Sequence, residues 1–138
     1  MFWNQEVETL SRTDMAIWQS HKLKKVIERI YEKSLLYGER MIKGGLKPED
    51  ITNVEQLSKL PFTTRQDLAQ NYPYGLLTMP ISGVSYIHKH QEIGNEPTAM
   101  SYTGNDMVMW TELMSRMLVA GGVNMTTVFQ LAISGQGC

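Results

Sequence analysis

The segment 60–67 constrains the fold most, because it ends one helix and begins another within a few residues. Pro61 pushes the residue before it out of the α region, so the preceding helix ends there. Thr63 or Thr64 then supplies an N-cap, and Asp67 falls in the first turn of the following helix. The segment predicts short helices joined by tight turns.

The chain before and just after this segment has the pattern of further helices. Ser11 is an N-cap with Asp14 three residues later, and it predicts a long amphipathic helix to about Ser34. The apolar face of that helix consists of Trp18, Val26, Ile27, Ile30 and Tyr31. Three further elements are a helix at 36–42 that stops at Gly44-Gly45, a turn at 47–50 and a helix at 54–60. The helix capped at residue 63 or 64 ends before residue 71, so the first 75 residues are expected to be helical.

The second part of the chain favours strands. A β-branched and aromatic run at 84–88 predicts a strand, with 98–102 as its partner. Thr103 and Asp106 form a capping pair for a helix that ends at Gly121-Gly122. The apolar face of this helix consists of Met107, Trp110, Met114, Met117 and Leu118. We expect Trp110 to belong to the core, and we interpret residues 127–133 as a buried strand.

These elements indicate a mixed, helix-rich α/β fold. We expect residues 1–80 to form a helical N-terminal segment. Residues 81–138 have the order strand, strand, helix, strand, which is how an α/β sheet begins and not how it finishes. We therefore expect residues 81–138 to be the truncated start of a larger α/β domain.

Composition excludes several classes of function. The 138 residues carry a formal charge of −1, so there is no electrostatic case for binding nucleic acid or an anionic membrane. The basic residues of segment 22–29 alternate with acidic ones, which is typical of a solvated helix face. A single cysteine, no run of ~20 apolar residues and no signal pattern predict a soluble cytoplasmic chain. The 10 methionines are expected to fill gaps in the core.

Few residues have the pattern of a catalytic or metal site. His88 and His90 would share one face of a strand and could ligate a metal with Glu92, but exposed histidines at a strand end are the simpler interpretation. Cys138 has no orienting partner in the sequence. Asp67 and Asp106 are better explained as first-turn residues than as paired acids. The residues alone therefore predict no catalytic residue and no metal site.

The segment 60–68, with Tyr72-Pro73-Tyr74-Gly75-Leu76 after it, resembles the motif "LPFTTK.DL…YPFGL" that opens phenylacetate–CoA ligases. Residues 45–51 are similar to the family's "GVKPEDI", and the matches continue in register to residues 128–130. The resemblance implies an AMP-forming, adenylating enzyme of aromatic acid catabolism. The intact family enzyme uses ATP, Mg²⁺ and coenzyme A to join an aryl acetic acid to coenzyme A.

The ATP loop of the family, "ASSGTTGKPT", is not recognisable in this chain. Its counterparts are His90, Gln91, Glu92, Ile93, Gly94, Asn95 and Glu96, and only Pro97 and Thr98 at the loop edge match. Two of these residues are acidic and would repel phosphate; like charges ~4 Å apart repel by about 1 kcal/mol even in water. We therefore expect no ATP site at these residues and no cofactor for this chain.

The segment "GYGLFTGG" of the family is also absent before Cys138. A frameshift near Ile133, a deliberately shortened chain and natural divergence are three open explanations.

The leading interpretation is the N-terminal part of a phenylacetate–CoA ligase that is inactive by itself. Its expected partner is the remainder of the ligase or a second copy of the chain, because an open sheet edge favours self-association. A non-catalytic helical interaction module and a nucleotide-binding pseudoenzyme are the alternatives.

Overall fold

The computed structural model describes residues 1–90, 96–128 and 130. Its α-helices are α1 (Gln5–Glu8), α2 (Arg12–Lys33), α3 (Leu35–Lys43), α4 (Arg65–Gln70) and α5 (Gly104–Ala120). Its 3₁₀ helices are η1 (Pro48–Asp50), η2 (Val54–Lys59) and η3 (Ile81–Gly83). Its strands are β1 (Val84–His90) and β2 (Thr98–Thr103). The expected helix-rich α/β class is confirmed.

A small hydrophobic core lies where α2, α3 and the segment after η1 meet. Its buried residues are Ile27, Met41 and Ile51, with 2%, 0% and 1% of their surfaces exposed. The partly buried side chains around them are Leu23, Ile30, Tyr31, Leu46 and Leu60. Gly38 allows the close approach of α3 to α2, because a Cβ there would lie 2.7 Å from the Tyr31 carbonyl oxygen. These contacts make one packed unit of α2, α3 and the segments around η1 and η2.

Helices α3 and α5 are each followed by a glycine pair, and both helices end in the same way. Gly45 follows α3 with φ +68°, and Leu46 N–H donates to the Met41 carbonyl at 2.8 Å. Gly122 follows α5 with φ +92°, and Val123 N–H donates to the Leu118 carbonyl at 3.0 Å. Both are the Schellman arrangement, in which a residue without Cβ adopts a positive φ at no steric cost. The glycine stops predicted from the sequence are confirmed.

The strands β1 and β2 form an antiparallel hairpin. Their register pairs Tyr86 with Tyr102, His88 with Met100 and His90 with Thr98, and it shifts by one residue near Ser85. Thr103 caps α5 directly after β2, and the Thr103 N–H donates a hydrogen bond to Asp106 Oδ2 at 2.8 Å. Helix α5 therefore leaves the hairpin without a loop.

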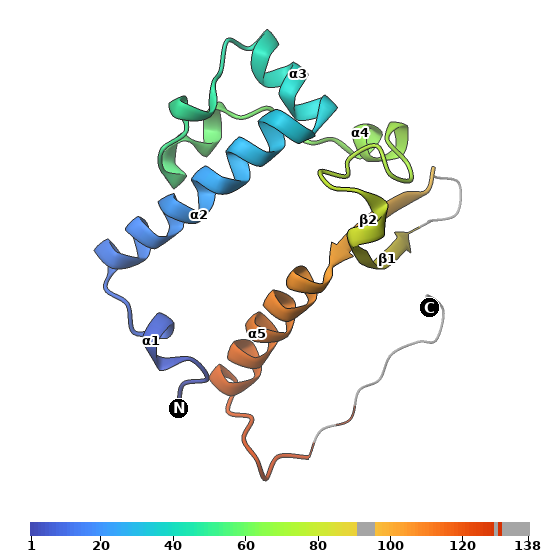
Figure 1. Ribbon diagram of the computed structural model, residues 1–138. Helices are drawn as coiled ribbons and strands as arrows, with labels where there is room; N and C mark the ends of the chain where they lie inside the picture. Colours follow the sequence, from blue (N-terminus) through green and yellow to red (C-terminus); the bar gives the residue numbers. More distant parts are fainter. Residues whose placement is uncertain (91–95, 129, 131–138) are drawn as a thin grey trace.

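Figure 1 shows α2 and α5 on opposite sides of the molecule, with α3, α4 and the hairpin at one end and α1 at the other. At the α1 end, Glu112 of α5 accepts hydrogen bonds from Trp3 Nε1 at 2.7 Å and from Asn4 Nδ2 at 3.0 Å. Arg116, one turn further along α5, also binds Glu112, at 2.8 Å. These bonds fasten the N-terminal segment to one face of α5.

Two expectations about the core are wrong. Trp110 is 47% exposed, Met114 is 44% exposed, and α5 has no buried residue. Among the described methionines only Met41 is fully buried, whereas most of the others are exposed. Of the apolar face that the helical spacing predicted, Trp110, Met114 and Met117 are exposed, whereas Met107 and Leu118 are half-buried.

Two further expectations concern a strand at 127–133 and membrane-spanning helices. Of the strand expected at 127–133, Thr127, Val128 and Gln130 are described and lie in no strand, and the remaining residues lie outside the described ranges. None of the helices in the described part of the chain is long and apolar enough to cross a bilayer.

Candidate functional site

The signature segment 60–67 forms a junction between α3 and α4. Arg40 of α3 binds Asp67 of α4 through two parallel hydrogen bonds, Nη1 to Oδ2 at 2.9 Å and Nη2 to Oδ1 at 2.5 Å. Arg40 Nη1 also donates to the Phe62 carbonyl at 2.9 Å. Asp67 is only 5% exposed. We call this arrangement the Arg40–Asp67 junction, and its bidentate form is the strongest pairing that these two groups make.

The same carboxylate also begins α4. Thr64 N–H donates to Asp67 Oδ2 at 2.7 Å, and Asp67 N–H donates to the Thr64 hydroxyl oxygen at 3.2 Å. This reciprocal pair is a capping box, with aspartate at N3. The Tyr37 and Thr63 hydroxyls also hydrogen bond to each other beside it. The predicted first-turn role of Asp67 is confirmed, and Thr64 is the cap.

Charge in the junction stays fixed near neutral pH. The guanidinium of Arg40, followed by the Thr64 hydrogen bonds, holds the pKa of Asp67 well below its ordinary value of 3.8. The hydrogen bond from Arg40 to Asp67 in turn raises the pKa of Arg40, and burial raises the pKa of Tyr37. A permanently ionised pair with all its partners inside the protein holds helices together and exchanges no protons near pH 7. The junction is a structural element, not an acid–base pair.

Sequence reasoning did not find Arg40. It lies 27 residues before Asp67, and no spacing rule connects positions so far apart. The one available signal was an arginine near the end of a helix, which also fits a simple interaction with the helix dipole.

The counterpart of the ATP loop joins β1 to β2 at the tip of the hairpin. The last paired residues are His90 and Thr98; Thr98 is 7% exposed and Glu96 is exposed. Pro97 is half-buried. Gln91, Glu92, Ile93, Gly94 and Asn95 lie outside the described residues. The structure thus places both edges of the predicted loop at one end of the hairpin and leaves the ATP prediction untested.

The two histidines considered as metal ligands lie on β1 at alternate positions, opposite Met100 and Thr98. Among the described residues, no group of three or more His, Cys, Asp or Glu side chains is placed to hold a metal ion. Cys138 lies outside the described ranges.

Aromatic rings connect the hairpin to α5. Tyr102 stacks on Trp110, with ring centroids 5.3 Å apart and 17° between the ring planes, and it also lies 6.1 Å from Tyr86. A cavity of about 450 Å³ opens beside this stack. Its lining consists of Ser101, Tyr102, Asp106, Met109, Trp110 and Leu113. Only Asp106 in that lining is charged, and the Thr103 hydrogen bonds lower its pKa.

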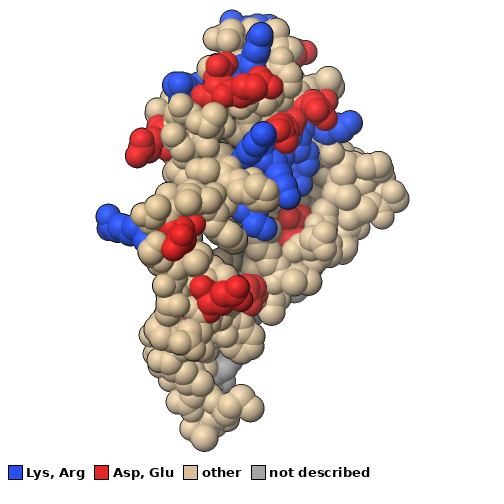
Figure 2. Space-filling model, turned by 60° about the vertical axis from the view of Figure 1, so that its left-hand side comes forward, with Lys and Arg blue, Asp and Glu red and all other residues tan. Residues whose placement is uncertain are grey.

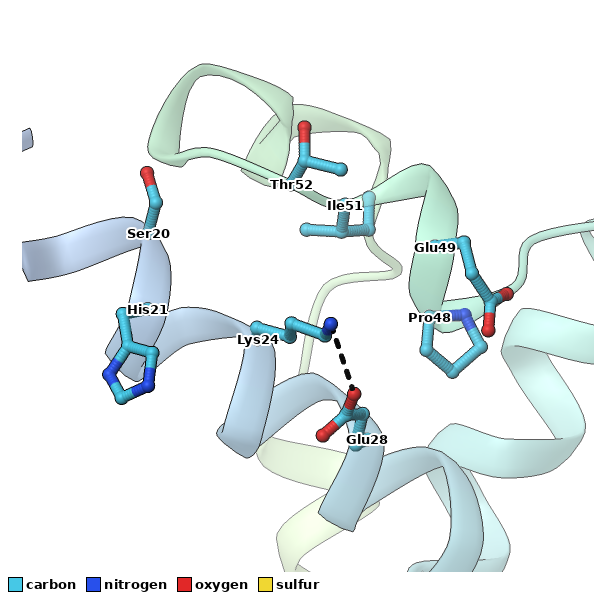
Figure 3. Close-up of a pocket in the computed structure, with 8 residues that line it drawn as sticks. All are labelled: Ser20, His21, Lys24, Glu28, Pro48, Glu49, Ile51 and Thr52. Atoms are coloured by element: carbon cyan, nitrogen blue, oxygen red, sulfur yellow. Dashed lines mark ion pairs between the residues drawn. The ribbon is translucent and has the colours of Figure 1, made fainter. Parts of the chain in front are cut away.

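A second cavity, of about 360 Å³, lies between α2 and the segment around η1 (Figure 3). Its walls are the eight labelled residues, among them Lys24 and Glu28, whose Nζ and Oε1 atoms are 3.9 Å apart. Both side chains are exposed, that of Lys24 by 70% and that of Glu28 by 48%. This pairing agrees with the solvated helix face expected for the basic cluster. Neither cavity brings together a nucleophile, a base and an oxyanion site.

Comparison with known proteins supplies the family. No protein-family model matches the chain. Phenylacetate–coenzyme A ligase of Thermus thermophilus is 32% identical over 122 residues, which is 88% of this chain and 27% of that enzyme. The Pseudomonas putida ligase is 34% identical and the Escherichia coli ligase 33% identical, each over 116 residues, 84% of this chain and 26% of the enzyme. Over most of its length the chain is similar to enzymes of the phenylacetate–CoA ligase family.

The chain corresponds to the N-terminal part of these enzymes, and it spans about a quarter of the length of the curated ligases that it matches. The fold agrees with this. Crystal structures of 2-hydroxyisobutyryl-CoA ligase superpose on 89% of the chain at 18% identity. One is in the postadenylation state with 2-HIB-AMP (TM-score 0.77, 26% of that chain), and another is in the thioesterification state with 2-HIB-AMP and CoA (TM-score 0.78, 27% of that chain). The segment 60–67 thus forms the Arg40–Asp67 junction within a fold that this chain shares with these CoA ligases.

Proposed function

We propose that this chain provides the helical N-terminal segment, residues 1–80, and the beginning of the adenylation domain, residues 81–138, of an acid–CoA ligase. The proposed reaction of the whole enzyme consumes ATP, an aryl acetic acid and CoA, and yields aryl-acetyl-CoA, AMP and diphosphate. ATP, Mg²⁺ and CoA are the cofactors and co-substrates of that enzyme. A cytoplasmic location in aromatic acid breakdown is part of the same proposal.

One observation carries this proposal. The similarity to three phenylacetate–CoA ligases, at 32–34% identity, extends over 84–88% of the chain. The structural neighbours add chemistry of the same kind, because they are CoA ligases with an acyl adenylate bound. We propose by this similarity that the whole enzyme to which this chain contributes catalyses the same ligase reaction.

The 138 residues are further proposed to catalyse nothing by themselves. The side chains at the edge of the loop do not fit ATP, because the exposed carboxylate of Glu96 would repel phosphate. Glu92 adds a second negative charge in the sequence of the loop. A fold that stabilises phosphate uses backbone N–H groups and cations instead.

Isothermal titration tests the second part directly. The 138-residue chain is titrated with Mg·ATP and separately with phenylacetate, and we expect no heat of binding for either. Micromolar binding of ATP would contradict our interpretation of residues 90–98. In parallel, incubation with ATP, phenylacetate and CoA, followed by mass spectrometry, is expected to yield no phenylacetyl-CoA.

A further inference from the structure

One face of the hairpin brings two histidines and a methionine together. Side chains alternate between the two faces of a strand, so His88 and His90 of β1 share a face. The register places Met100 of β2 directly opposite His88, and it places Tyr102 opposite Tyr86. The rings of Tyr86 and Tyr102 lie 6.1 Å apart, so side chains paired by this register do meet on that face. We call His88, His90 and Met100 the His–Met cluster.

The spacing of the His–Met cluster suits a single metal ion. Directly opposite residues of an antiparallel pair have Cβ atoms about 4.5–5.5 Å apart, and diagonal neighbours are about 7–8 Å apart. His88 and Met100 are the direct pair, whereas His90 lies on the diagonal to Met100. Imidazole and thioether side chains span these separations and still allow metal–ligand distances of about 2.0–2.3 Å. The three side chains can therefore converge on one ion without a change of the backbone.

Neighbouring aromatic residues hold the methionine in place. The Tyr102 hydroxyl donates a hydrogen bond to Met100 Sδ at 3.6 Å. Tyr102 itself stacks on Trp110 of α5, with ring centroids 5.3 Å apart. A partner that hydrogen bonds to a metal ligand orients that ligand, and the second lone pair of the thioether sulfur stays available for a metal. Met100 is thus oriented by a contact that continues into α5.

Solvent reaches the His–Met cluster. Met100 is 49% exposed, His90 is exposed and His88 is half-buried. Each imidazole has two ring nitrogens, so a hydrogen bond at one nitrogen leaves the other able to bind a metal. An ion can therefore enter from solvent while the hairpin stays folded.

The ligand types favour a soft ion. In sequence, β1 and β2 contain neither Asp nor Glu, so the hairpin lacks the carboxylates that hard cations prefer. On the face drawn in Figure 2, Asp and Glu lie mostly near Lys and Arg, and the lowest part carries no charged residue. Thioether sulfur selects Cu(I) among the biological metals, and imidazole binds copper as well. Two imidazoles and a thioether are neutral ligands, which suit an ion of single charge.

We propose that His88, His90 and Met100 form a binding site for Cu(I), a soft monovalent metal ion. The histidine spacing in the sequence suggests two ligands, and the hairpin register adds the third. The site does not depend on the proposed function, because no substrate of the ligase reaction takes part in it.

A Cu(I) titration tests the site. The 138-residue chain is prepared with Cys138→Ser, because a cysteine thiolate binds Cu(I) by itself. The titration is performed under nitrogen with ascorbate as reductant, and bicinchoninate competes for the ion and reports its free concentration by absorbance. We expect the chain to withdraw one equivalent of Cu(I) from bicinchoninate.

Matched variants in the same Cys138→Ser chain make the titration specific. We expect His88→Gln, His90→Gln and Met100→Leu each to weaken Cu(I) binding at least tenfold. The controls are Met117→Leu, an exposed methionine about 20 Å along α5 from its first residue, and His21→Gln, an exposed histidine of α2. Both controls are expected to leave the affinity within twofold. Circular dichroism is expected to show all variants folded, because each replacement is close in size to the original side chain.

Three results would overturn the proposal. The first is a chain that withdraws no Cu(I) from bicinchoninate. The second is an equal effect of Met100→Leu and Met117→Leu, which would assign binding to exposed methionines in general. The third is Zn²⁺ binding as tight as Cu(I) binding, which would mean that the thioether does not select the ion.

Discussion

Residues 12–70 and residues 81–128 differ in what they bury. The first region contains all three buried hydrophobic residues of the described chain, Ile27, Met41 and Ile51. In the second region the buried residue is Thr98, which is polar, and α5 buries none. The two regions have equally well-formed helices and caps. Local sequence signals thus suffice to form secondary structure, whereas only the first region has a core of its own.

The largest expected effect on stability comes from replacing a buried methionine, and an exposed methionine serves as its control. Met41→Ala removes a fully buried side chain, and it is expected to lower the free energy of unfolding by about 2–5 kcal/mol. Met117→Ala removes an exposed one, and its effect is expected to stay within about 0.5 kcal/mol. Urea unfolding followed by circular dichroism measures both. Similar losses in the two variants would show that α5 is packed in the free chain.

The next effect concerns the Arg40–Asp67 junction. Asp67→Asn keeps a capping oxygen but removes the charge that Arg40 binds, leaving the guanidinium without its partner. The melting temperature is expected to fall on the order of 10 °C. The control is Glu39→Gln, which removes the exposed Lys43–Glu39 pair on α3, the helix that contains Arg40. That change is expected to shift the melting temperature by no more than about 2 °C.

The junction also predicts how stability depends on pH. The folded-state pKa of Asp67 lies below the ordinary value of 3.8, so its contribution is complete at neutral pH. It is lost as the pH falls through 3.8 towards the lower folded-state pKa. Thermal melts between pH 2 and pH 6 are expected to show a steeper loss below about pH 4 in the natural chain than in Asp67→Asn. Parallel curves would show that Asp67 does not contribute to the pH dependence of stability.

The smallest effects compare two equivalent capping boxes. Thr64→Ala and Thr103→Ala each remove an N-cap hydroxyl from a box closed by aspartate at N3. Loss of Thr64 is expected to reduce the global free energy of unfolding by about 1 kcal/mol. Loss of Thr103 is expected to lower the hydrogen-exchange protection of α5 amides only, because α5 opens without disturbing the core. A global loss in Thr103→Ala would mean that both regions unfold as one.

The sequence predicted most elements of both regions because their signals are local. Ser11, Thr64 and Thr103 cap the helices that the sequence predicts. Gly45 and Gly122 have a positive φ and follow the ends of α3 and α5. The small helix α1 was not predicted. It is only four residues long, and Asn4 caps it.

Tertiary contacts were predictable only in part. The apolar spacing of α5 predicted which residues share a side of the helix, but spacing does not reveal whether another element is present to cover them. For the same reason Trp110 and Met114 were assigned to the core and are exposed. At the site, the Asp67 cap follows a local rule, whereas its pairing with Arg40 joins residues 27 positions apart.

Native-state hydrogen exchange of the 138-residue chain tests the central claim most directly. If residues 12–70 contain the only core in the described chain, buried amides of α2 and α3 exchange only through global unfolding. Amides in the middle of α5 are then expected to exchange at least tenfold faster. Equal protection of α2 and α5 in the free chain would contradict the claim.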